Sequence, residues 1–503
     1  MSTIAMKLCS LILQEHFGET VRIVGEDLFA AITKTIAGVC STTKLSRKQV
    51  TSSLAVLVQY RLVKYKALDS NENLAEYSLL HDKILLFLRY PRYLYYLPKK
   101  YGEPSRLLVE EMLKSGIDTA QSVIMKAYAN SDDKNDKTLI LFRDSFLDLL
   151  NERFIMRSPE VTEDTVPQLK VNVPSVFMPP ELDLAELKNA IEQGTEIKSD
   201  IYWIVHFDKF HQIFRDKILV DAIERQIDSN AAECFQFILQ LMYNKTDAWA
   251  STSNPISFIE IKQLVERKSS NKELVQYIEQ YVSIIEKNDC GFLSKNDEAG
   301  GGLYTINMAH AFQQLACTAI ENVITQKFGS KATRIFRVVR AKKFIEQEDI
   351  QREAMIPGKE AKQFTYKLLE ENFLQIQTIK KAGGGGMGPA KAFYLFRVNQ
   401  NHIVLTLVET CYKALYNAMT RALQDKENNK RLIEKSLRLQ YIVEQMKERG
   451  EQEDINETLT PPEKEIVEKS KMRLKRLESS EVAVDEMLLL LQLFIYYKSP
   501  SNK

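Results

Sequence analysis

Four times along the chain, a stretch with apolar residues three and four positions apart leads directly into a short apolar segment. The first such stretch carries Val50, Leu54, Leu57 and Val58, a spacing that places them on one face of a helix. The segments that follow the helices are residues 60–65, 152–157, 290–294 and 371–376. A helix that runs into a strand in this way is typical of the third helix and wing of a winged helix. The pattern therefore predicts four winged helices in one polypeptide.

Prolines and glycines mark the boundaries between these units. Residues 158–180 contain five prolines, which predicts an extended linker that cannot be helical. Glycine runs at 300–302 and 383–386 are expected at the tips of the third and fourth wings. Ser46 and Ser270 are expected to begin helices, because Gln or Glu follows each after three residues, as in a capping box. We expect winged helices at residues 1–88, 89–158, 182–329 and 330–402, with a linker at residues 159–181.

Residues 403–503 have a different pattern. Apolar residues step by four and three from Val408 to Ala422, and a similar step recurs between residues 474 and 495. These heptads predict an antiparallel coiled-coil hairpin about 50 Å long. We favour a projecting hairpin that binds partners, although two core helices of the fourth domain would give the same pattern. The candidate partner-binding residues are Leu474, Leu477, Val484, Leu488, Leu491 and Ile495.

The expected fold class is therefore mainly α with small β wings, and composition agrees with it. A chain of 503 residues fits about three to five domains, and its 45% hydrophobic and 27% charged content is ordinary for globular proteins. The net charge of +1 means that any nucleic acid would be bound by local patches. The six cysteines form no CxxC pair, which fits a reducing compartment, and no stretch reaches the roughly 18 apolar residues of a membrane span.

Residues with the spacing of a catalytic or metal site are missing from the sequence. The histidines form no HExxH pair, the glycine runs do not match a phosphate-binding GxxxxGK[ST] loop, and the aspartates do not cluster as polymerase metal ligands would. We therefore expect no catalytic residue, no metal and no cofactor.

A basic run without acidic residues opens the fourth unit. Arg337, Arg340 and Lys343 are three residues apart, so they fall along one flank of a helix and could reach phosphates. A solvated rim around apolar residues is an equally good interpretation. Further cations lie at the starts of the recognition helices and in the fourth wing. Glu360, Glu370 and Glu371 offset the positive charge of the fourth recognition helix, which favours protein docking over sequence-specific DNA recognition. The candidate DNA-binding residues are Arg47, Lys48, Arg334, Arg337, Arg340, Lys342, Lys343, Lys359, Lys362, Lys380, Lys381 and Lys391.

Aromatic and basic residues alternate over residues 89–101, which read RYPRYLYYLPKKY. Such interleaving suits stacking on single-stranded nucleic acid. Tyrosines with one apolar body and one polar end also suit interdomain seams, and this structural interpretation is favoured.

Two segments carry a resemblance to a known family. Residues 8–18 read LCSLILQEHFG and residues 88–93 read LRYPRY, and both resemble N-terminal motifs of the third subunit of eukaryotic RNA polymerase III. The order of the remaining elements is similar to that family over essentially the whole chain. The resemblance implies a non-catalytic nuclear subunit, related in architecture to the large subunit of TFIIE. Such a subunit would dock on the polymerase clamp with two partner subunits and aid promoter opening, with single-stranded DNA nearby, at tRNA, 5S rRNA and other small-RNA genes.

Two alternatives belong to other classes. A PCI-type scaffold subunit of a proteasome-lid-like or translation assembly also ends in a winged helix and a long helix, but it would show helical repeats throughout its first half. The strand-like segments at Leu62 and Phe154 disfavour it. A free winged-helix DNA-binding regulator would carry a strongly basic recognition helix, which is missing.

Overall fold

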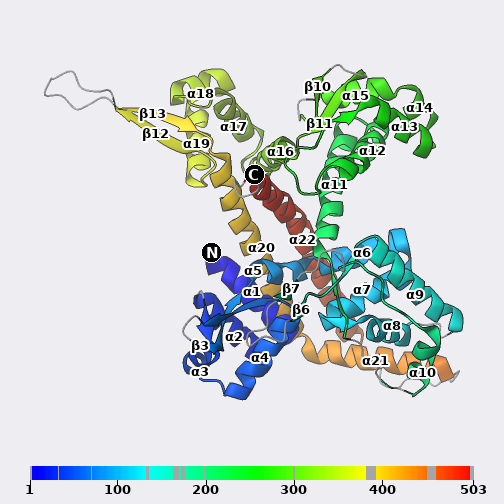
Figure 1. Cartoon of the computed structure of the whole chain (residues 1–503). Helices are drawn as coiled ribbons and strands as arrows, with labels where there is room; N and C mark the ends of the chain where they lie inside the picture. The colour runs from blue at the N-terminus through cyan, green and yellow to red at the C-terminus, as the bar shows by residue number, and fades with distance from the viewer. Residues whose placement is uncertain are drawn as a thin grey trace. The chain divides into compact units, whose positions relative to one another are not determined.

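The chain forms two compact units, each mainly helical with small antiparallel sheets (Figure 1). Unit 1 comprises Met1–His211 with Tyr412–Asp485, and unit 2 comprises Gln212–Cys411 with Glu486–Lys503. This computed structural model confirms the predicted fold class. It describes residues 3–31, 33–68, 71–131, 135–161, 169–170, 176–193, 195, 200–288, 291–297, 301–380, 392–449 and 460–498.

The first winged helix lies in unit 1. Its elements are α1 (Thr3–Phe17), α2 (Glu19–Ala30), β1 (Lys34–Thr35), α3 (Ile36–Thr43), α4 (Arg47–Gln59), β2 (Val63–Leu68) and β3 (Asn71–Leu79). The strands form an antiparallel sheet in the order β1-β3-β2. Ser46 caps α4 in a complete capping box with Gln49, as predicted. Leu8, Ile12, Leu54 and Leu57 lie in the core.

All four predicted passages from helix to strand share one backbone device. The second residue of each passage has a positive φ: Arg61 (55°), Arg153 (64°), Gly291 (58°) and Asn372 (62°). In the first passage, the N–H of Arg61 donates to the Val58 carbonyl and that of Leu62 to the Leu57 carbonyl, both at 2.9 Å. This is a Schellman motif, which satisfies the last carbonyls of the helix and redirects the chain into the strand. The same paired bonds recur after residues 149 and 368.

The second winged helix completes the N-terminal part of unit 1. Its elements are α5 (His81–Leu85), η1 (Leu86–Arg89), α6 (Tyr90–Tyr101), α7 (Glu103–Ser115), β4 (Asp118–Thr119), α8 (Ala120–Ala129), α9 (Asp136–Asn151), β5 (Ile155–Arg157), β6 (Glu160–Val161), β7 (Leu169–Lys170), α10 (Leu184–Gln193) and β8 (Tyr202–Val205). β8 lies between β4 and β5 and is antiparallel to both.

The position of β8 corrects the predicted boundary at residue 158. The sequence predicts that residues 159–181 only link the second and third winged helices. In the structure, the central strand of the sheet of the second winged helix is β8, which follows this segment. The proline-rich segment also contains strands, because β6 pairs with β7. The second winged helix therefore extends to Val205. The sequence did not predict this extension, because a short apolar strand far from its partners gives no local sign of which sheet it joins.

The third winged helix lies mainly in unit 2. Its elements are α11 (Phe207–Gln226), α12 (Ser229–Lys245), β9 (Ile256–Ser257), α13 (Phe258–Lys268), α14 (Lys272–Gln276), α15 (Ile278–Glu286), β10 (Leu293–Asp297), β11 (Leu303–Ile306) and α16 (Met308–Phe328). Gly301 and Gly302 have positive φ between β10 and β11, as a wing turn requires, while Gly300 is outside the described residues. The predicted capping box at Ser270 is wrong. Asn271 caps α14 instead, because its side chain reaches the Glu273 N–H at 3.1 Å.

The fourth winged helix also belongs to unit 2. It consists of α17 (Ser330–Lys342), α18 (Gln347–Ala354), α19 (Gly358–Glu370), β12 (Gln375–Lys380) and β13 (Ala392–Arg397). β12 and β13 pair in a hairpin that extends away from α17 to α19 (Figure 1). The glycine run at 383–386 falls outside the described residues.

The C-terminal helices pair in antiparallel fashion. They are α20 (Gln400–Asn428), α21 (Lys430–Arg449) and α22 (Pro461–Lys498). Lys435 contacts Glu463 at 3.1 Å, whereas the earlier Asp425 contacts the later Arg473 at 2.8 Å. Later residues of α22 thus contact earlier residues of α21 and α20, so the helices are antiparallel, which confirms the predicted hairpin.

The expectation that this hairpin projects freely is wrong. Its residues are divided between the two units, and Leu488 and Leu491 are buried in unit 2. Leu474, Leu477 and Val484 are half-buried, and only Ile495 of the candidate partner-binding residues is exposed. Most of these heptad side chains are therefore at least partly buried within the chain, because they pack into the core of one unit or the other.

Candidate nucleic-acid and assembly surfaces

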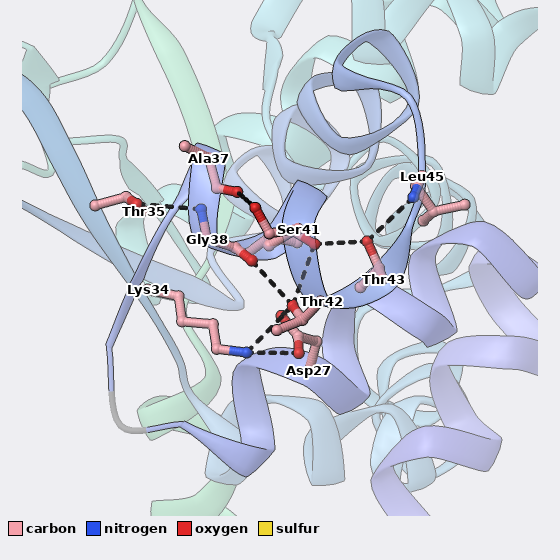
Figure 2. Close-up of polar contacts among 10 residues, drawn as sticks. Asp27, Lys34, Thr35, Ala37, Gly38, Ser41, Thr42, Thr43 and Leu45 are labelled. Atoms are coloured by element: carbon pink, nitrogen blue, oxygen red, sulfur yellow. Dashed lines mark hydrogen bonds and ion pairs between the residues drawn. The ribbon is translucent and has the colours of Figure 1, made fainter.

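Polar contacts hold α3 of the first winged helix against α2. The Lys34 Nζ donates to Asp27 Oδ1 at 2.6 Å, and the Thr42 hydroxyl donates to Asp27 Oδ2 at 2.8 Å (Figure 2). The Thr35 hydroxyl caps α3 by accepting from the Gly38 N–H at 3.3 Å. Lys34 is thereby neutralised inside the domain, and the short connection into α4 starts from a fixed helix.

The surface that follows α3 is basic. Residues 28–68 contain seven Lys or Arg and no acidic residue. Lys44, Arg47 and Lys48 are exposed at the α3–α4 connection and the start of α4, and none has an ion-pair partner in the described part of the chain. The backbone of Lys44 is in the left-handed αL conformation, with a φ of 57°, and this residue caps the C-terminal end of α3. The structure thus brings Arg47 and Lys48 together with Lys44, a cation that the sequence pattern did not single out.

The basic run of the fourth winged helix is arranged differently. Arg337 Nε and Arg340 Nη1 both contact the carboxylate of Glu321, at 2.8 and 2.9 Å. Glu321 belongs to α16 and is only 8% exposed. A nearly buried carboxylate that binds two arginines offsets part of their charge and fixes their side chains. This geometry favours the structural alternative for these two residues.

The neighbouring cations are also largely engaged. Lys331 pairs with Glu360 at 2.5 Å, Lys342 with Glu353 at 3.3 Å, and Arg334 donates to the Ala354 carbonyl at 3.4 Å. Lys343, Lys359 and Lys362 are exposed and have no ion pair among the described residues. Lys380 ends β12, and Lys381 and Lys391 lie outside the described residues. The fourth winged helix therefore offers scattered cations.

The alternating aromatic and basic segment forms part of the unit 1 core. Tyr93 is fully buried, packs on Phe210 with ring centroids 4.7 Å apart, and its hydroxyl lies 2.8 Å from His211 Nε2. Burial, followed by the charges of Arg89, Lys83 and Arg92, lowers the pKa of His211 to about 3. The imidazole is therefore neutral at pH 7, and because Arg89 can only donate, Nε2 accepts from both Arg89 and Tyr93. The favoured structural interpretation of Tyr93 is confirmed.

Arg89 and Arg92 bind a carboxylate of the C-terminal helix. Asp485 on α22 accepts from Arg89 Nε at 2.9 Å and from Arg92 Nη1 at 2.8 Å. The Asp485 side chain is 1% exposed. This buried cluster fastens the end of the unit 1 part of α22 to η1 and α6, so these arginines serve assembly of the fold.

A second buried charge lies in unit 2. Arg215 on α11 is fully buried and contacts Asp216 at 2.8 Å, the Tyr497 hydroxyl at 2.9 Å, and the Tyr243 hydroxyl at 2.5 Å. It also donates to the Ala248 carbonyl. Burial alone lowers the pKa of Arg215, but Asp216 and the two tyrosines more than offset it. Sequence reasoning missed this residue, because a single arginine on a helix carries no local sign of burial.

Glu481 on α22 gives unit 1 a dependence on pH. Burial, followed by the charges of Glu15 and Glu478, raises the pKa of Glu481 to about 7, against a small opposing effect of Lys426. An unfolded glutamate titrates near 4.5, so the folded protein holds an extra proton between the two values. The free energy of unfolding therefore falls as pH rises through this range.

We expect Glu481→Gln to remove this dependence. Because the side chain is half-exposed and solvent screens its neighbours, the variant should be about 1 kcal/mol more stable than the parent at pH 8, with the difference vanishing towards pH 4.5. Urea unfolding at several pH values measures it. Glu468→Gln, at an exposed position of the same helix, should leave the profile unchanged. Parallel profiles for Glu481→Gln and the parent would contradict the assignment.

Neither a metal site nor a membrane span is found among the described residues. In that part of the chain, no three His, Cys, Asp or Glu side chains are grouped so that they could hold a metal ion. None of the described helices combines the length and apolarity needed to span a membrane.

Similarity to known proteins decides the family. The DNA-directed RNA polymerase III subunit RPC3 of Homo sapiens is 33% identical to this chain, over 98% of the chain and 99% of the human protein. The chain belongs to the RNA polymerase III subunit RPC3 family. The RPC3 proteins of Danio rerio and Dictyostelium discoideum are 30% and 24% identical. These alignments cover 97% and 50% of the chain, and 98% and 39% of the relatives.

Family models match the chain in the order of its structure. The helix-turn-helix domain of RNA polymerase III subunit RPC82 matches residues 7–68, and the RPC82 model matches residues 156–315. The POLR3C C-terminal winged-helix domain matches residues 320–398, and the RPC3 helical hairpin domain matches residues 431–490. The resemblance drawn from the two N-terminal motifs is confirmed. A PCI-type scaffold and a free regulator are excluded, and membership of the RPC3 family implies a polymerase III subunit that associates with other polymerase subunits.

Proposed function

We propose that this chain is a non-catalytic nuclear subunit of RNA polymerase III that docks on the clamp with two partner subunits. In this position it would help to open promoter DNA at tRNA, 5S rRNA and other small-RNA genes. Membership of the RPC3 family supports the assembly. The observation that carries the DNA contact is the group of exposed cations Lys44, Arg47 and Lys48 in the first winged helix, within a segment, residues 28–68, that has no acidic residue.

This surface suits phosphates better than base edges. The three cations lie at and before the N-terminal end of α4, where backbone N–H groups and the helix dipole also favour negative charge. Further along α4 the exposed residues include Thr51, Ser52 and Ala55, which offer no arginine for bidentate contact with guanine. The chain would therefore position DNA without reading its sequence.

The fourth winged helix is the weaker candidate. Arg337 and Arg340 share the nearly buried Glu321 carboxylate, so phosphate contact by either exposed arginine would compete with its ion pair. Lys343, Lys359 and Lys362 could add isolated phosphate contacts, and Lys380, Lys381 and Lys391 remain candidates at the wing.

The test is promoter opening by polymerase assembled with Lys44→Ala/Arg47→Ala/Lys48→Ala. We expect weaker opening, and a log-log salt dependence reduced by up to about 0.7 to 0.9 for each phosphate that the variant no longer neutralises. Elongation from a preformed bubble should be unchanged. Assembly should survive because substitutions of exposed residues alter stability little.

A matched control separates location from net charge. Lys262→Ala/Arg267→Ala/Lys272→Ala removes three exposed cations from the third winged helix, none of them ion-paired within the described residues. This variant should open promoters like the parent. Equal defects in both triple variants, or no defect in either, would refute a DNA contact at the first winged helix.

A further inference from the structure

The edge of the first wing has unpaired backbone groups. β2 is the outer strand of the sheet β1-β3-β2, so only one of its sides faces β3. The Leu80 N–H donates to the Leu62 carbonyl at 2.7 Å, and Lys64 is opposite Ser78 in the register that continues from this pair. Hydrogen-bonded pairs alternate along an antiparallel ladder, so Val63 and Tyr65 direct their N–H and C=O groups away from β3.

These outward groups have no hydrogen-bond partner among the described residues. Val63 is only 5% exposed, so water reaches it poorly. Backbone groups that are buried in this way are almost always paired in native structures. An open strand edge is also the usual template for the addition of a strand from another chain.

A cavity of about 750 Å³ lies beside β2 within unit 1. Residues of β2 form one wall, and β5 and β8 of the second winged helix contribute to the others. Its apolar lining includes Leu80, Leu86, Met112, Met156 and Ile204. A cavity of this size and apolar character is in the range of ligand sites in proteins.

The charges that line the cavity are unbalanced. Arg61, Lys64 and Lys83 line it, against Asp208 as the one carboxylate among the described lining residues. The Arg61 guanidinium is partly buried, and its Nη2 donates to the Ser158 hydroxyl at 2.6 Å. Burial lowers the pKa of Arg61, against an opposing effect of Tyr65, so the guanidinium has lost part of its hydration. An acidic ligand would complement this cavity.

We propose that the cavity beside β2 binds an extended segment of another polypeptide, which adds to β2 as a further strand and alternates apolar with acidic side chains. Side chains along a strand point alternately to opposite faces, so one set would enter the apolar lining while the other meets the lysines. Main-chain hydrogen bonds to Val63 and Tyr65 would supply affinity, and the lining would supply specificity.

A peptide fits these features better than nucleic acid. Nucleic acid would use the cations, but it offers neither a ladder of alternating N–H and C=O groups for the strand edge nor aliphatic side chains for Leu86 and Met112. The inference rests on the proposed function only because the partner is sought in the assembled polymerase. Lys44, Arg47 and Lys48 do not line the cavity, so the two proposals fail independently.

Site-specific cross-linking in purified, assembled polymerase tests the proposal. Lys64 is exposed at the cavity and is replaced by the photo-cross-linker p-benzoylphenylalanine, with Lys272 of the third winged helix as the control position. After irradiation, the cross-linked peptides are sequenced by mass spectrometry. We expect the Lys64 position to capture one short segment of another subunit in which apolar and acidic residues alternate.

Two further changes test how the segment is held. Tyr65→Pro removes an outward N–H, which an edge strand tolerates, whereas Tyr65→Ala removes the side chain and keeps the N–H. The cross-link yield should fall about tenfold with proline and much less with alanine. Lys66→Glu/Lys83→Glu, which reverses two exposed charges, should also lower it about tenfold. Circular dichroism of each variant checks that it is folded.

Each other result overturns the proposal. Capture of residues of this same chain would mean that the chain fills its own cavity, and capture of DNA or RNA would assign the cations to nucleic acid. A yield no higher than at Lys272 would mean that nothing docks there. Equal yields with Tyr65→Pro and Tyr65→Ala would exclude strand addition.

Discussion

Replacement of Arg215 by methionine is expected to lower the free energy of unfolding of unit 2 by about 3 to 5 kcal/mol. Methionine fills much of the space but donates no hydrogen bond. The Ala248 carbonyl loses its donor, and Asp216 loses the cation that compensates its charge. A polar group left buried without a partner costs its full desolvation energy, which exceeds the small net gain of making the bond.

The two tryptophans of the chain allow this effect to be measured in one unit. Trp249 lies 5.1 Å from the Arg215 guanidinium and belongs to unit 2, whereas Trp203 belongs to unit 1. In a Trp203→Phe background, fluorescence during urea unfolding reports unit 2. Arg225→Met, at an exposed position of the same helix, should change stability by no more than about 0.5 kcal/mol. Equal midpoints for the Arg215 and Arg225 variants would refute a stabilising role of the buried guanidinium.

Asp485→Asn should have a comparable effect on unit 1. The substitution keeps the shape of the side chain but removes the buried negative charge that both Arg89 and Arg92 contact, and their side chains are only 6% and 14% exposed. Removal of one partner from a buried ion pair costs about 3 to 5 kcal/mol. Trp203 fluorescence in a Trp249→Phe background follows unit 1, and Glu465→Gln, in an exposed pair with Lys469, should cause no resolvable change.

A triple replacement separates the charge from the packing. Asp485→Leu/Arg89→Met/Arg92→Met removes the whole cluster, and buried ion clusters replaced by apolar residues often regain stability. This variant should be more stable than Asp485→Asn. If the triple variant is less stable than Asp485→Asn, the hydrogen bonds of the cluster stabilise unit 1 by more than the loss of the Asp485 charge destabilises it.

Local features of the fold were predictable from the sequence. The passage from helix to wing depends on adjacent residues, so the apolar segment after each helix identified all four winged helices. The Ser46 capping box was predictable for the same reason, because its two partners are three residues apart. At Ser270 the same signal misled, since the adjacent Asn271 caps helices about as well as serine and takes the cap of α14 instead.

Features that depend on distant residues were not predictable. β8 pairs with β4 and β5, from which a proline-rich segment separates it in the sequence. Asp485 contacts Arg89, which lies 396 residues earlier in the chain. The basic run of α17 illustrates the consequence for the candidate site. The expected flank holds for Arg337 and Arg340, but Lys343 lies beyond the end of α17 with a φ of 65°. Glu321, which contacts both arginines, comes from the preceding helix and changes what those cations are available to bind.

The distance between Arg89 and Asp485 along the chain also constrains biosynthesis. At about 5 to 20 residues per second, a ribosome needs roughly 20 to 80 s to add the 396 residues that separate them. Through this time the nascent N-terminal winged helices have emerged while two buried arginines still await their carboxylate. The middle segment of unit 2, Gln212–Cys411, is synthesised within the same interval. Unit 1, although it begins first, is therefore completed only after Asp485 has been translated.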